Sequence, residues 1–476
     1  MKKLTEINPK NVFEFFELLC SVPHGSFNVE RISELCCDFA RARGLEYFRD
    51  GAGNVIIKKP ASKGFEGRPA VILQGHMDMV AVKNPDCDID LEKDGLRLAS
   101  DGEYVWAEGT SLGADDCVAL AMIMAILDSE DIEHPPIEAL FTVNEEVGML
   151  GASALDASLL SGKTMINIDS EEENVITVGC AGGILLTASF PMKRTKDYVH
   201  AAMIAIYGLT GGHSGGEIHK NRANSNVLMA QLLTKLGDVR LISANGGDKP
   251  NAIANKTVCR IALSDFAAAK KAVETFEQEV KEKYAETDPG LTVRIVDEGF
   301  KNSGAADLIS SRRIIKALNE LPDGVQTMSD AIEGLVQTSL NFGVLNISDF
   351  RTELTYCLRS SVSAEKLALR EKLEGIIKAN RGRAEFSGDY PAWEYREESS
   401  LRSVAVMSYE KLYGRKPGLS VIHAGLECGI LSGKIPGLDC ISIGPDILNI
   451  HTTSERLSVA STERTFELVL DIRKNL

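Results

Sequence analysis

Short apolar runs that alternate with helical patterns constrain the fold of this chain more than any other feature of its sequence. Four runs have the length and composition of strands: residues 54–57, 70–74, 138–143 and 165–168. A very apolar segment at residues 116–127 predicts a buried helix between them. Because parallel strands need long crossover connections, this alternation predicts an α/β domain with a mainly parallel sheet flanked by helices.

The pattern changes near residue 187, where strands and helices begin to follow one another in an order that occurs twice. The first half contains strands at 201–207, 239–243, 252–263 and 291–296, with helices at 224–236 and 267–284. The second contains strands at 335–344, 351–358 and 383–387, with helices at 314–318 and 364–379. This order predicts an inserted α+β lid domain of two similar halves at residues 187–394.

The α/β domain is therefore expected in two parts, residues 1–186 and 395–476. Residues 9–43 predict two helices, separated by a break at Pro23-His24-Gly25. After the insertion, residues 401–413, 425–431 and 440–443 resume the α/β pattern.

Composition excludes several classes of function. The 476 residues carry a formal net charge of −16, which argues against binding to nucleic acid or to an anionic membrane surface. The first residues lack the apolar run of a signal peptide, and the ten cysteines form no regular framework. We therefore expect a cytoplasmic protein with a small-molecule partner.

Polar residues gather where the predicted strands end, which is where open α/β sheets bind ligands. Five segments share this placement: Gly75-His76-Met77-Asp78, Leu112-Gly113-Ala114-Asp115-Asp116, Asn144-Glu145-Glu146, Ile168-Asp169, and Asn449-Ile450-His451 near the end of the chain. The first two have ordinary alternatives, since a histidine is common at turns and an aspartate is common at a helix N-cap. The run Glu171-Glu172-Glu173 is expected to be a solvated surface turn.

Together these segments supply two histidines and at least three carboxylates, a set that suits two Zn²⁺ ions with open positions for water. Ions that prefer oxygen alone do not need the histidines. Paired metal ions are a recurrent solution for hydrolysis.

The segment Gly212-His213-Ser214-Gly215-Gly216 also matches the nucleophile elbow of serine hydrolases. That elbow joins a strand to a helix of the main sheet, whereas this segment lies in the predicted insertion. The serine hydrolase alternative is therefore weak.

With these segments in this order, the sequence resembles the di-zinc exopeptidase family that includes carboxypeptidase G, aminoacylase and the cytosolic dipeptidases. The resemblance spans almost the whole chain and includes Gly211-Gly212-His213-Ser214-Gly215-Gly216. It implies that His76 and Asp169 hold one zinc, that Glu146 and His451 hold the other, and that Asp115 bridges them. It also implies a cis peptide between Asp115 and Asp116.

The resemblance further implies that Asp78 orients His76, that Glu145 is the general base, and that His213 stabilises the oxyanion. Substrate contacts are expected from Asn251, Arg359, His423 and Glu427, the last toward a free α-amino group. The implied reaction is hydrolysis of a dipeptide, of the Xaa-His type and including β-alanyl-histidine, by a zinc-bridged water. Mn²⁺ or Co²⁺ can replace Zn²⁺ at such sites.

Two rival functions stay open from the sequence. A deacylase or tripeptidase of the same fold differs only in its substrate, and a non-catalytic binding protein stabilised by metal would retain the ligands without turnover. Relatives often dimerise through the lid, so a homodimer is also expected, although the doubled lid leaves open whether it acts in cis or in trans.

Overall fold

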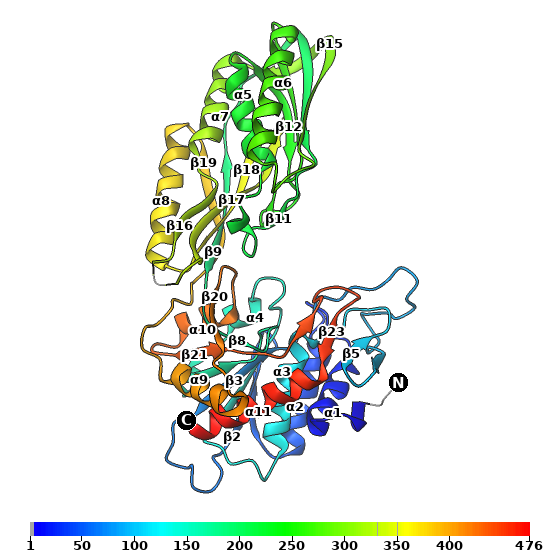
Figure 1. Cartoon of the computed structure of the whole chain (residues 1–476), viewed down its shortest axis with the longest axis vertical. Coiled ribbons are helices and arrows are strands. Elements are labelled where there is room, and N and C mark those ends of the chain that lie inside the picture. The colour runs from blue at the N-terminus through cyan, green and yellow to red at the C-terminus, as the bar shows by residue number, and fades with distance from the viewer. Residues whose placement is uncertain (1–3, 331, 350) are drawn as a thin grey trace. The chain divides into compact units, whose positions relative to one another are not determined.

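The computed structural model describes residues 4–330, 332–349 and 351–476, which form two compact units (Figure 1). Unit 1 contains the described residues up to Cys180 together with Tyr395–Val421 and Leu426–Leu476. Unit 2 contains Ala181–Glu394 and Ile422–Gly425. The sequence placed its domain limits at 186/187 and 394/395, beside the unit limits at 180/181 and 394/395.

The main sheet of unit 1 has eight strands in the order β1-β2-β6-β3-β7-β21-β8-β20. Their bounds are β1 Glu46–Arg49, β2 Val55–Lys59, β3 Val71–His76, β6 Ile137–Thr142, β7 Thr164–Asn167, β8 Val175–Cys180, β20 Gly418–Ile422 and β21 Asp439–Ser442. The central strands β6, β3, β7 and β21 are parallel, whereas β1, β2 and β8 pair antiparallel with their neighbours. The predicted α/β architecture is confirmed, with antiparallel strands added outside the parallel core.

The helices of unit 1 pack against this sheet and against one another. They are α1 Lys10–Cys20, α2 Glu30–Ala42, α3 Ala114–Asp128, α4 Leu150–Ala154, α9 Ser400–Tyr413, α10 Glu427–Lys434 and α11 Val459–Asn475, with short 3-10 turns at Leu4–Glu6 and Ala157–Leu159. Helix α3 is buried along nearly its whole length because it lies between α1 and β3, which explains its continuous apolar sequence. A small antiparallel sheet joins β4 Leu98–Ser100, β5 Tyr104–Ala107, β23 Arg456–Ser458 and β22 Ile447–Leu448.

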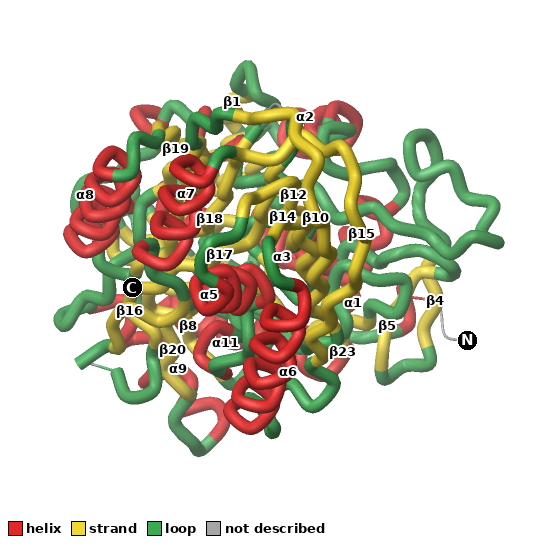
Figure 2. Tube along the Cα trace, turned by 90° about the horizontal axis from the view of Figure 1, so that it is seen from above, coloured by secondary structure: helices red, strands yellow, loops and turns green. Residues whose placement is uncertain are grey.

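Unit 2 is built on an antiparallel sheet of nine strands in the order β15-β10-β14-β12-β17-β18-β9-β19, with β16 paired to β17. Their bounds are β9 Gly182–Ser189, β10 Arg194–Tyr207, β12 Arg240–Gly246, β14 Thr257–Leu263, β15 Thr292–Ala306, β16 Gly324–Met328, β17 Val336–Ile347, β18 Thr352–Ser360 and β19 Arg383–Tyr390. Four helices lie on one side of the strands (Figures 1 and 2): α5 Ser225–Leu236, α6 Phe266–Lys283, α7 Leu308–Glu320 and α8 Ser363–Ala379. One continuous apolar core joins these helices to the sheet, so the predicted α+β lid architecture is confirmed.

One predicted strand of unit 2 is wrong in detail. Residues 252–263 form two strands, because β13 Ala252–Ile253 leaves the main sheet and pairs with β11 Gly212–His213. The bend follows from a competing hydrogen bond, since the carbonyl of Ala254 accepts from the amide of Ser225 at the start of α5. A further 3-10 turn, Ile218–Lys220, follows β11.

Among the residues that the structure describes, none of the helices has both the length and the apolar composition needed to cross a bilayer.

Candidate metal centre

The site lies where the parallel strands of unit 1 reach their carboxyl ends. His76 is the last residue of β3 and pairs with Thr142, the last residue of β6, while Asn167 ends β7 two residues before Asp169. Because these strands are parallel neighbours, the polar residues that follow them must emerge at one edge of the sheet. The acidic residues that follow separate apolar runs in the sequence therefore lie close together in the structure.

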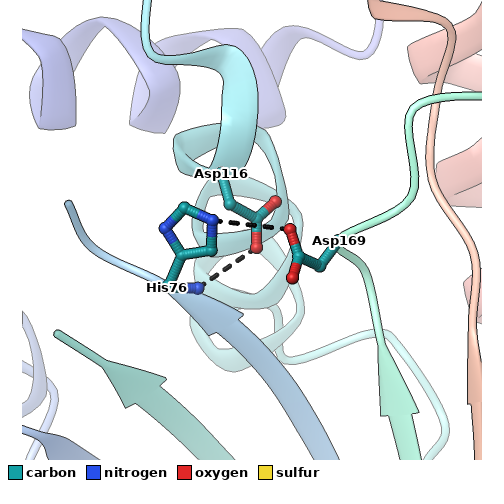
Figure 3. A group of neighbouring side chains, drawn as sticks. All are labelled: His76, Asp116 and Asp169. Carbon is teal, nitrogen blue, oxygen red and sulfur yellow. Dashed lines mark hydrogen bonds and ion pairs between the residues drawn. The ribbon is translucent and has the colours of Figure 1, made fainter. Parts of the chain in front are cut away.

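His76 is the buried anchor of this cluster, with a side chain only 1% exposed. Its Nδ1 lies 2.9 Å from the carbonyl oxygen of Asp78, which can only accept, so Nδ1 carries the proton. Its Nε2 then faces Asp115 Oδ1 at 3.0 Å and Asp169 Oδ1 at 3.4 Å. Figure 3 shows the contact with Asp169 across the end of β3.

His451 is the more exposed counterpart, with 41% of its side chain accessible. Its Nε2 lies 3.2 Å from Asp115 Oδ2 and 2.8 Å from Glu146 Oε1. The second contact is not aligned as a hydrogen bond, and the buried Glu146 Oε1 has no hydrogen-bond partner among the described residues. Asp115 therefore places one oxygen before each of the two imidazoles.

Asp115 is the second residue of α3, at a point where the backbone of Asp115 and Asp116 is not helical. The peptide between Asp115 and Asp116 is cis, which confirms that prediction. Asp116 turns away from Asp115 and its Oδ2 accepts a hydrogen bond from the backbone N–H of His76 at 3.1 Å, as Figure 3 shows. A Cβ at Gly75 would lie 2.6 Å from that oxygen, so glycine is required before His76.

Charge in the cluster is unbalanced. Burial alone would lower the pKa of His76, yet Asp169 and Asp115 raise it well above its usual value. Close contacts with the carboxylates of Asp115 and Glu146 raise the pKa of His451 to about 10. Burial also raises the pKa of Asp169 to about 6, although His76 lies beside it. The arrangement therefore requires added positive charge, supplied by protons or by metal ions.

The donor set fits metal ions better than protons. Two potential ligand groups are His76 with Asp116 and Asp169, and His76 with Asp115 and Glu146, each with its ligand atoms within 4.8 Å of one another. Ligands about 2.0–2.2 Å from a tetrahedral zinc lie about 3.3–3.5 Å apart, close to the 3.4 Å between His76 Nε2 and Asp169 Oδ1. Imidazole nitrogen with carboxylate oxygen is the ligand chemistry of Zn²⁺ and its first-row neighbours.

Asp78 contributes in a way the sequence did not indicate. Its carboxylate lies 3.7 Å from His76 Nδ1, so the carbonyl rather than the carboxylate is the close contact to the ring. The fully buried carboxylate instead accepts from the amides of Glu145 at 2.9 Å and Glu146 at 3.4 Å and from the hydroxyl of Ser26 at 2.8 Å. One residue thus orients both the ring and the turn that carries the glutamate pair.

Glu145 is half-buried beside this cluster and is not needed to hold either histidine. Burial raises the pKa of Glu145 well above its usual value, and the charges of Asp169, Glu427 and Glu146 add to the increase. A carboxylate with a raised pKa can both accept and release a proton near neutral pH.

A polar network lies beneath the site, between the strands and the start of α10. The Oε2 of Glu427 accepts from Gln74 at 2.6 Å and from Thr142 at 2.5 Å, and Gln74 Oε1 accepts from Asn167 at 2.5 Å. Glu427 is fully buried, and burial raises its pKa to about 7. Its contact with a substrate amino group stays a prediction. In the structure, the side chain of Glu427 has no exposed surface.

Four other predicted residues belong to unit 2. His423 and Arg359 are buried, and Ser339 links them, since its hydroxyl lies 2.7 Å from His423 Nε2 and its backbone pairs with Arg359 across β17 and β18. The Arg359 guanidinium donates to the hydroxyl of Tyr390 at 2.9 Å. Desolvation and the charge of Arg359 lower the pKa of His423 to about 3.

His213 and Asn251 line a shared pocket of about 370 Å³ in unit 2. The imidazole Nδ1 of His213 accepts from the amides of Gly215 and Gly216, which leaves Nε2 free to carry the proton. Ser214 is buried, its hydroxyl has no hydrogen-bond partner among the described residues, and the segment starts at a two-residue strand rather than at a strand of the main sheet. These features argue against the serine hydrolase alternative.

Sequence reasoning missed several acidic residues. The expected solvated turn is wrong for Glu173, which is buried and forms a bidentate ion pair with Arg464. Glu171 is exposed, as expected, although partial desolvation and the charges of Asp115 and Asp169 raise its pKa to about 7. A run of three glutamates carries no signal that separates these positions.

Comparison with known proteins agrees with this geometry. Residues 72–475 match the model of peptidase family M20/M25/M40. The chain is 36% identical to the cytosol non-specific dipeptidase of Escherichia coli (strain K12), over all of this chain and 99% of the relative. The crystal structure of aminoacylhistidine dipeptidase from Vibrio alginolyticus superposes with a TM-score of 0.91 at 34% identity, covering all of this chain and 98% of that one. Aminopeptidase PepT from Bacillus cereus, at 19% identity and a TM-score of 0.57 over 98% of both chains, shares the fold.

Proposed function

This chain belongs to peptidase family M20/M25/M40, and on that premise we propose that it hydrolyses dipeptides in the cytosol. Two relatives that match along the whole chain are named a cytosol non-specific dipeptidase and an aminoacylhistidine dipeptidase. Substrates of the Xaa-His type, including β-alanyl-histidine, are therefore the first candidates.

One observation carries the proposal. The two oxygens of Asp115 lie 3.0 Å from His76 Nε2 and 3.2 Å from His451 Nε2, so one carboxylate joins two imidazoles. Family membership implies a dinuclear metal site, and this carboxylate is the natural bridge. We propose that His76 and Asp169 hold one ion, that Glu146 and His451 hold the other, and that both ions are Zn²⁺, with Mn²⁺ or Co²⁺ as substitutes.

When bound, two such cations polarise the scissile carbonyl and lower the pKa of a water molecule. Glu145 takes a proton from that water and delivers it to the leaving amine, as its raised pKa allows. Asp78 fixes the backbone amides of Glu145 and Glu146, so the base and its neighbouring ligand keep a constant spacing.

Unit 2 is proposed to act as a lid that binds the substrate. The Arg359 guanidinium donates to Tyr390, and its buried Nε has no hydrogen-bond partner among the described residues, which suits it to a peptide carboxylate. Asn251 and His423 supply polar contacts, and His213, with its proton on Nε2, is suited to donate to the oxyanion of the tetrahedral intermediate.

We also propose that the lid is a surface for a homodimer. Strand β15 lies at one edge of the unit 2 sheet, and the stacked rings of Tyr198 and Phe300 beside it are 69% and 61% exposed. An unpaired edge with exposed aromatic rings favours association. Light scattering of Tyr198→Glu and Phe300→Glu variants tests this: a monomeric wild type contradicts it.

The function itself is tested with a dipeptide panel on protein of measured metal content. We expect hydrolysis of dipeptides, with Xaa-His among the good substrates, lost with a chelator and restored by zinc. Preference for tripeptides or N-acyl amino acids would indicate the sibling activities, and metal binding without turnover of any of these would indicate a binding protein.

A further inference from the structure

Glu455 occupies an unusual place beside the metal centre, although it faces neither imidazole. Its side chain is buried, and its carboxylate accepts hydrogen bonds from three consecutive backbone amides. Oε2 accepts from Leu112 at 2.8 Å and from Gly113 at 3.1 Å, and Oε1 accepts from Ala114 at 2.9 Å. Both oxygens of one carboxylate are therefore committed to a single stretch of backbone.

These three amides immediately precede Asp115, and only the amide of Ala114 belongs to α3, whose backbone is not helical at Asp115 and Asp116. Gly113 is the N-cap residue, has a φ of 66°, and provides no side chain to cap the helix. The first amides of a helix have no partner within the helix, and a buried helix start must find acceptors elsewhere. Glu455 supplies these acceptors from more than 340 residues along the chain.

Glu455 also closes the loop that carries His451. Its amide donates to the carbonyl of Thr452 at 3.3 Å, and Thr452 Oγ1 donates to the carbonyl of Asn449 at 2.7 Å. Asn449 and His451 both adopt left-handed backbone, with φ values of 54° and 60°. This turn joins the paired strands β22 and β23 of the small sheet, and Glu455 is its last residue. The contacts of Glu455 therefore help to determine where the His451 ring lies.

We propose that Glu455 is a positioning residue that sets His451 against Asp115 and thereby determines how tightly the second metal ion binds. Glu455 connects the segment of Asp115 to the segment of His451. Its carboxylate accepts from the backbone amides before Asp115, and it lies four residues after His451. His76 ends β3 and Asp169 lies two residues after β7, so the main sheet, rather than this connection, places that pair. The inference rests on the proposed metal site and adds a residue that controls one half of it.

The chain contains a matched control in the main sheet of unit 1, at the end opposite to the metal centre. Glu138, near the start of β6, is also buried and accepts from the amides of Ser161 and Gly162 at 2.9 Å each. It pairs with Lys58 at 3.3 Å and is at the amino end of its strand, away from the carboxyl-end cluster. A glutamine at either position replaces one acceptor oxygen by a donor that faces backbone N–H groups.

The test compares Glu455→Gln with Glu138→Gln on zinc-loaded, full-length protein. Metal content is measured by elemental analysis, and the affinity of each equivalent by titration with a chromophoric chelator. Loss of an outer-shell partner typically costs about 10–100-fold in metal affinity. We expect Glu455→Gln to keep one equivalent at wild-type affinity and to bind the other about 10–100-fold more weakly, while Glu138→Gln keeps both.

Two further measurements separate positioning from a merely structural role. In Glu455→Gln, kcat should recover toward the wild-type value at excess zinc, and the d–d spectrum of the Co²⁺-loaded variant should change for one equivalent only. Should Glu455→Gln fail to fold, Glu455→Asp decides. This variant keeps the negative charge, but its side chain is one methylene shorter, so the carboxylate is moved away from the three amides. Unchanged affinity for both equivalents in the folded variant, or equal losses in Glu138→Gln, overturns the inference alone. A wild-type protein that does not bind two ions overturns the proposed function as well.

Discussion

The histidines of the two units respond to their surroundings in opposite directions. In unit 1, the carboxylates around His76 and His451 raise the pKa of both rings. In unit 2, desolvation and the charge of Arg359 lower the pKa of His213 and of His423. His76 and His451 thus lie among carboxylates that favour a bound cation. His213 and His423 stay neutral because they are desolvated and lie near the Arg359 guanidinium.

This difference indicates which ligand each cluster suits. The strand ends of unit 1 present carboxylates whose charges are not balanced, and this calls for positive ions. The cluster of unit 2 presents a buried guanidinium without an ion pair among the described residues, and this suits an anion such as a peptide carboxylate. Each variant below changes one residue in the cluster of unit 1 or of unit 2. The measurement checks that the effect is confined to that cluster.

The largest effect is expected for His76→Ala. Without its buried anchor the cluster of unit 1 should lose bound metal, and turnover should fall to background. Elemental analysis of the purified variant checks this, with His134→Asn as the control, since His134 is equally buried but bonds only to nearby loop residues. Normal metal content in His76→Ala would refute the ligand role.

Glu145→Gln should separate catalysis from metal binding within unit 1. We expect kcat to fall about 10²–10⁴-fold, because a general base contributes that much, while metal content and KM stay near wild-type values. Steady-state kinetics on metal-loaded protein provide the measurement. Glu146→Gln is the neighbouring comparison and should instead weaken metal binding; kcat unaffected in Glu145→Gln rules out the base assignment.

Arg359→Met should act on unit 2 alone. Loss of a charge-assisted hydrogen bond costs about 1.5–3 kcal/mol, so KM for dipeptides should rise about 10–150-fold without loss of metal. The wild type should also prefer dipeptides to their C-terminal amides, and the variant should lose this preference. Lys366→Met is the control, because that buried cation is already paired with Asp389 at 2.6 Å; an equal rise in KM there contradicts the assignment.

The smallest effect concerns stability and pH. His423 has a pKa of about 3 in the folded protein, against about 6.5 when unfolded, so the folded state binds fewer protons below pH 6.5. The neutral ring costs nothing above pH 6.5, and stability is lost progressively as the pH falls from 6.5 toward 3. Between pH 7 and pH 5 this loss should be about 2 kcal/mol. Urea unfolding should show that His423→Asn loses less stability over this interval than the wild type; identical losses contradict the linkage.

Much of unit 1 could be predicted from local sequence because its strands are buried on both faces. Residues 71–76 and 137–142 are fully buried, mainly apolar runs that end in polar groups, and parallel neighbours must align those ends. The antiparallel strands β1 and β8 were missed, because a short half-exposed run such as β1 and a glycine-containing run such as β8 resemble loops.

Site residues could be predicted where a sequence motif includes the side chain that acts. They were harder to predict where a backbone group makes the decisive hydrogen bond. The sequence motif suggested that the carboxylate of Asp78 orients His76, whereas the Asp78 carbonyl is the closer group. Asp116 and Glu455 also hold backbone amides, and no local pattern marks an acid whose partner is a distant N–H group.

By itself, the sequence determined which chemistry is available: acids and histidines at strand ends, a glycine where Asp116 leaves no room for a side chain, and an inserted α+β region with its own core. Only the tertiary structure decided which acids meet. Asp115 faces both imidazoles, Glu173 pairs with Arg464, and Glu455 accepts from backbone amides more than 340 residues earlier in the chain. The physical reason is that apolar periodicity reports local burial, whereas the partner of a buried charge is selected by chain segments that only folding brings together.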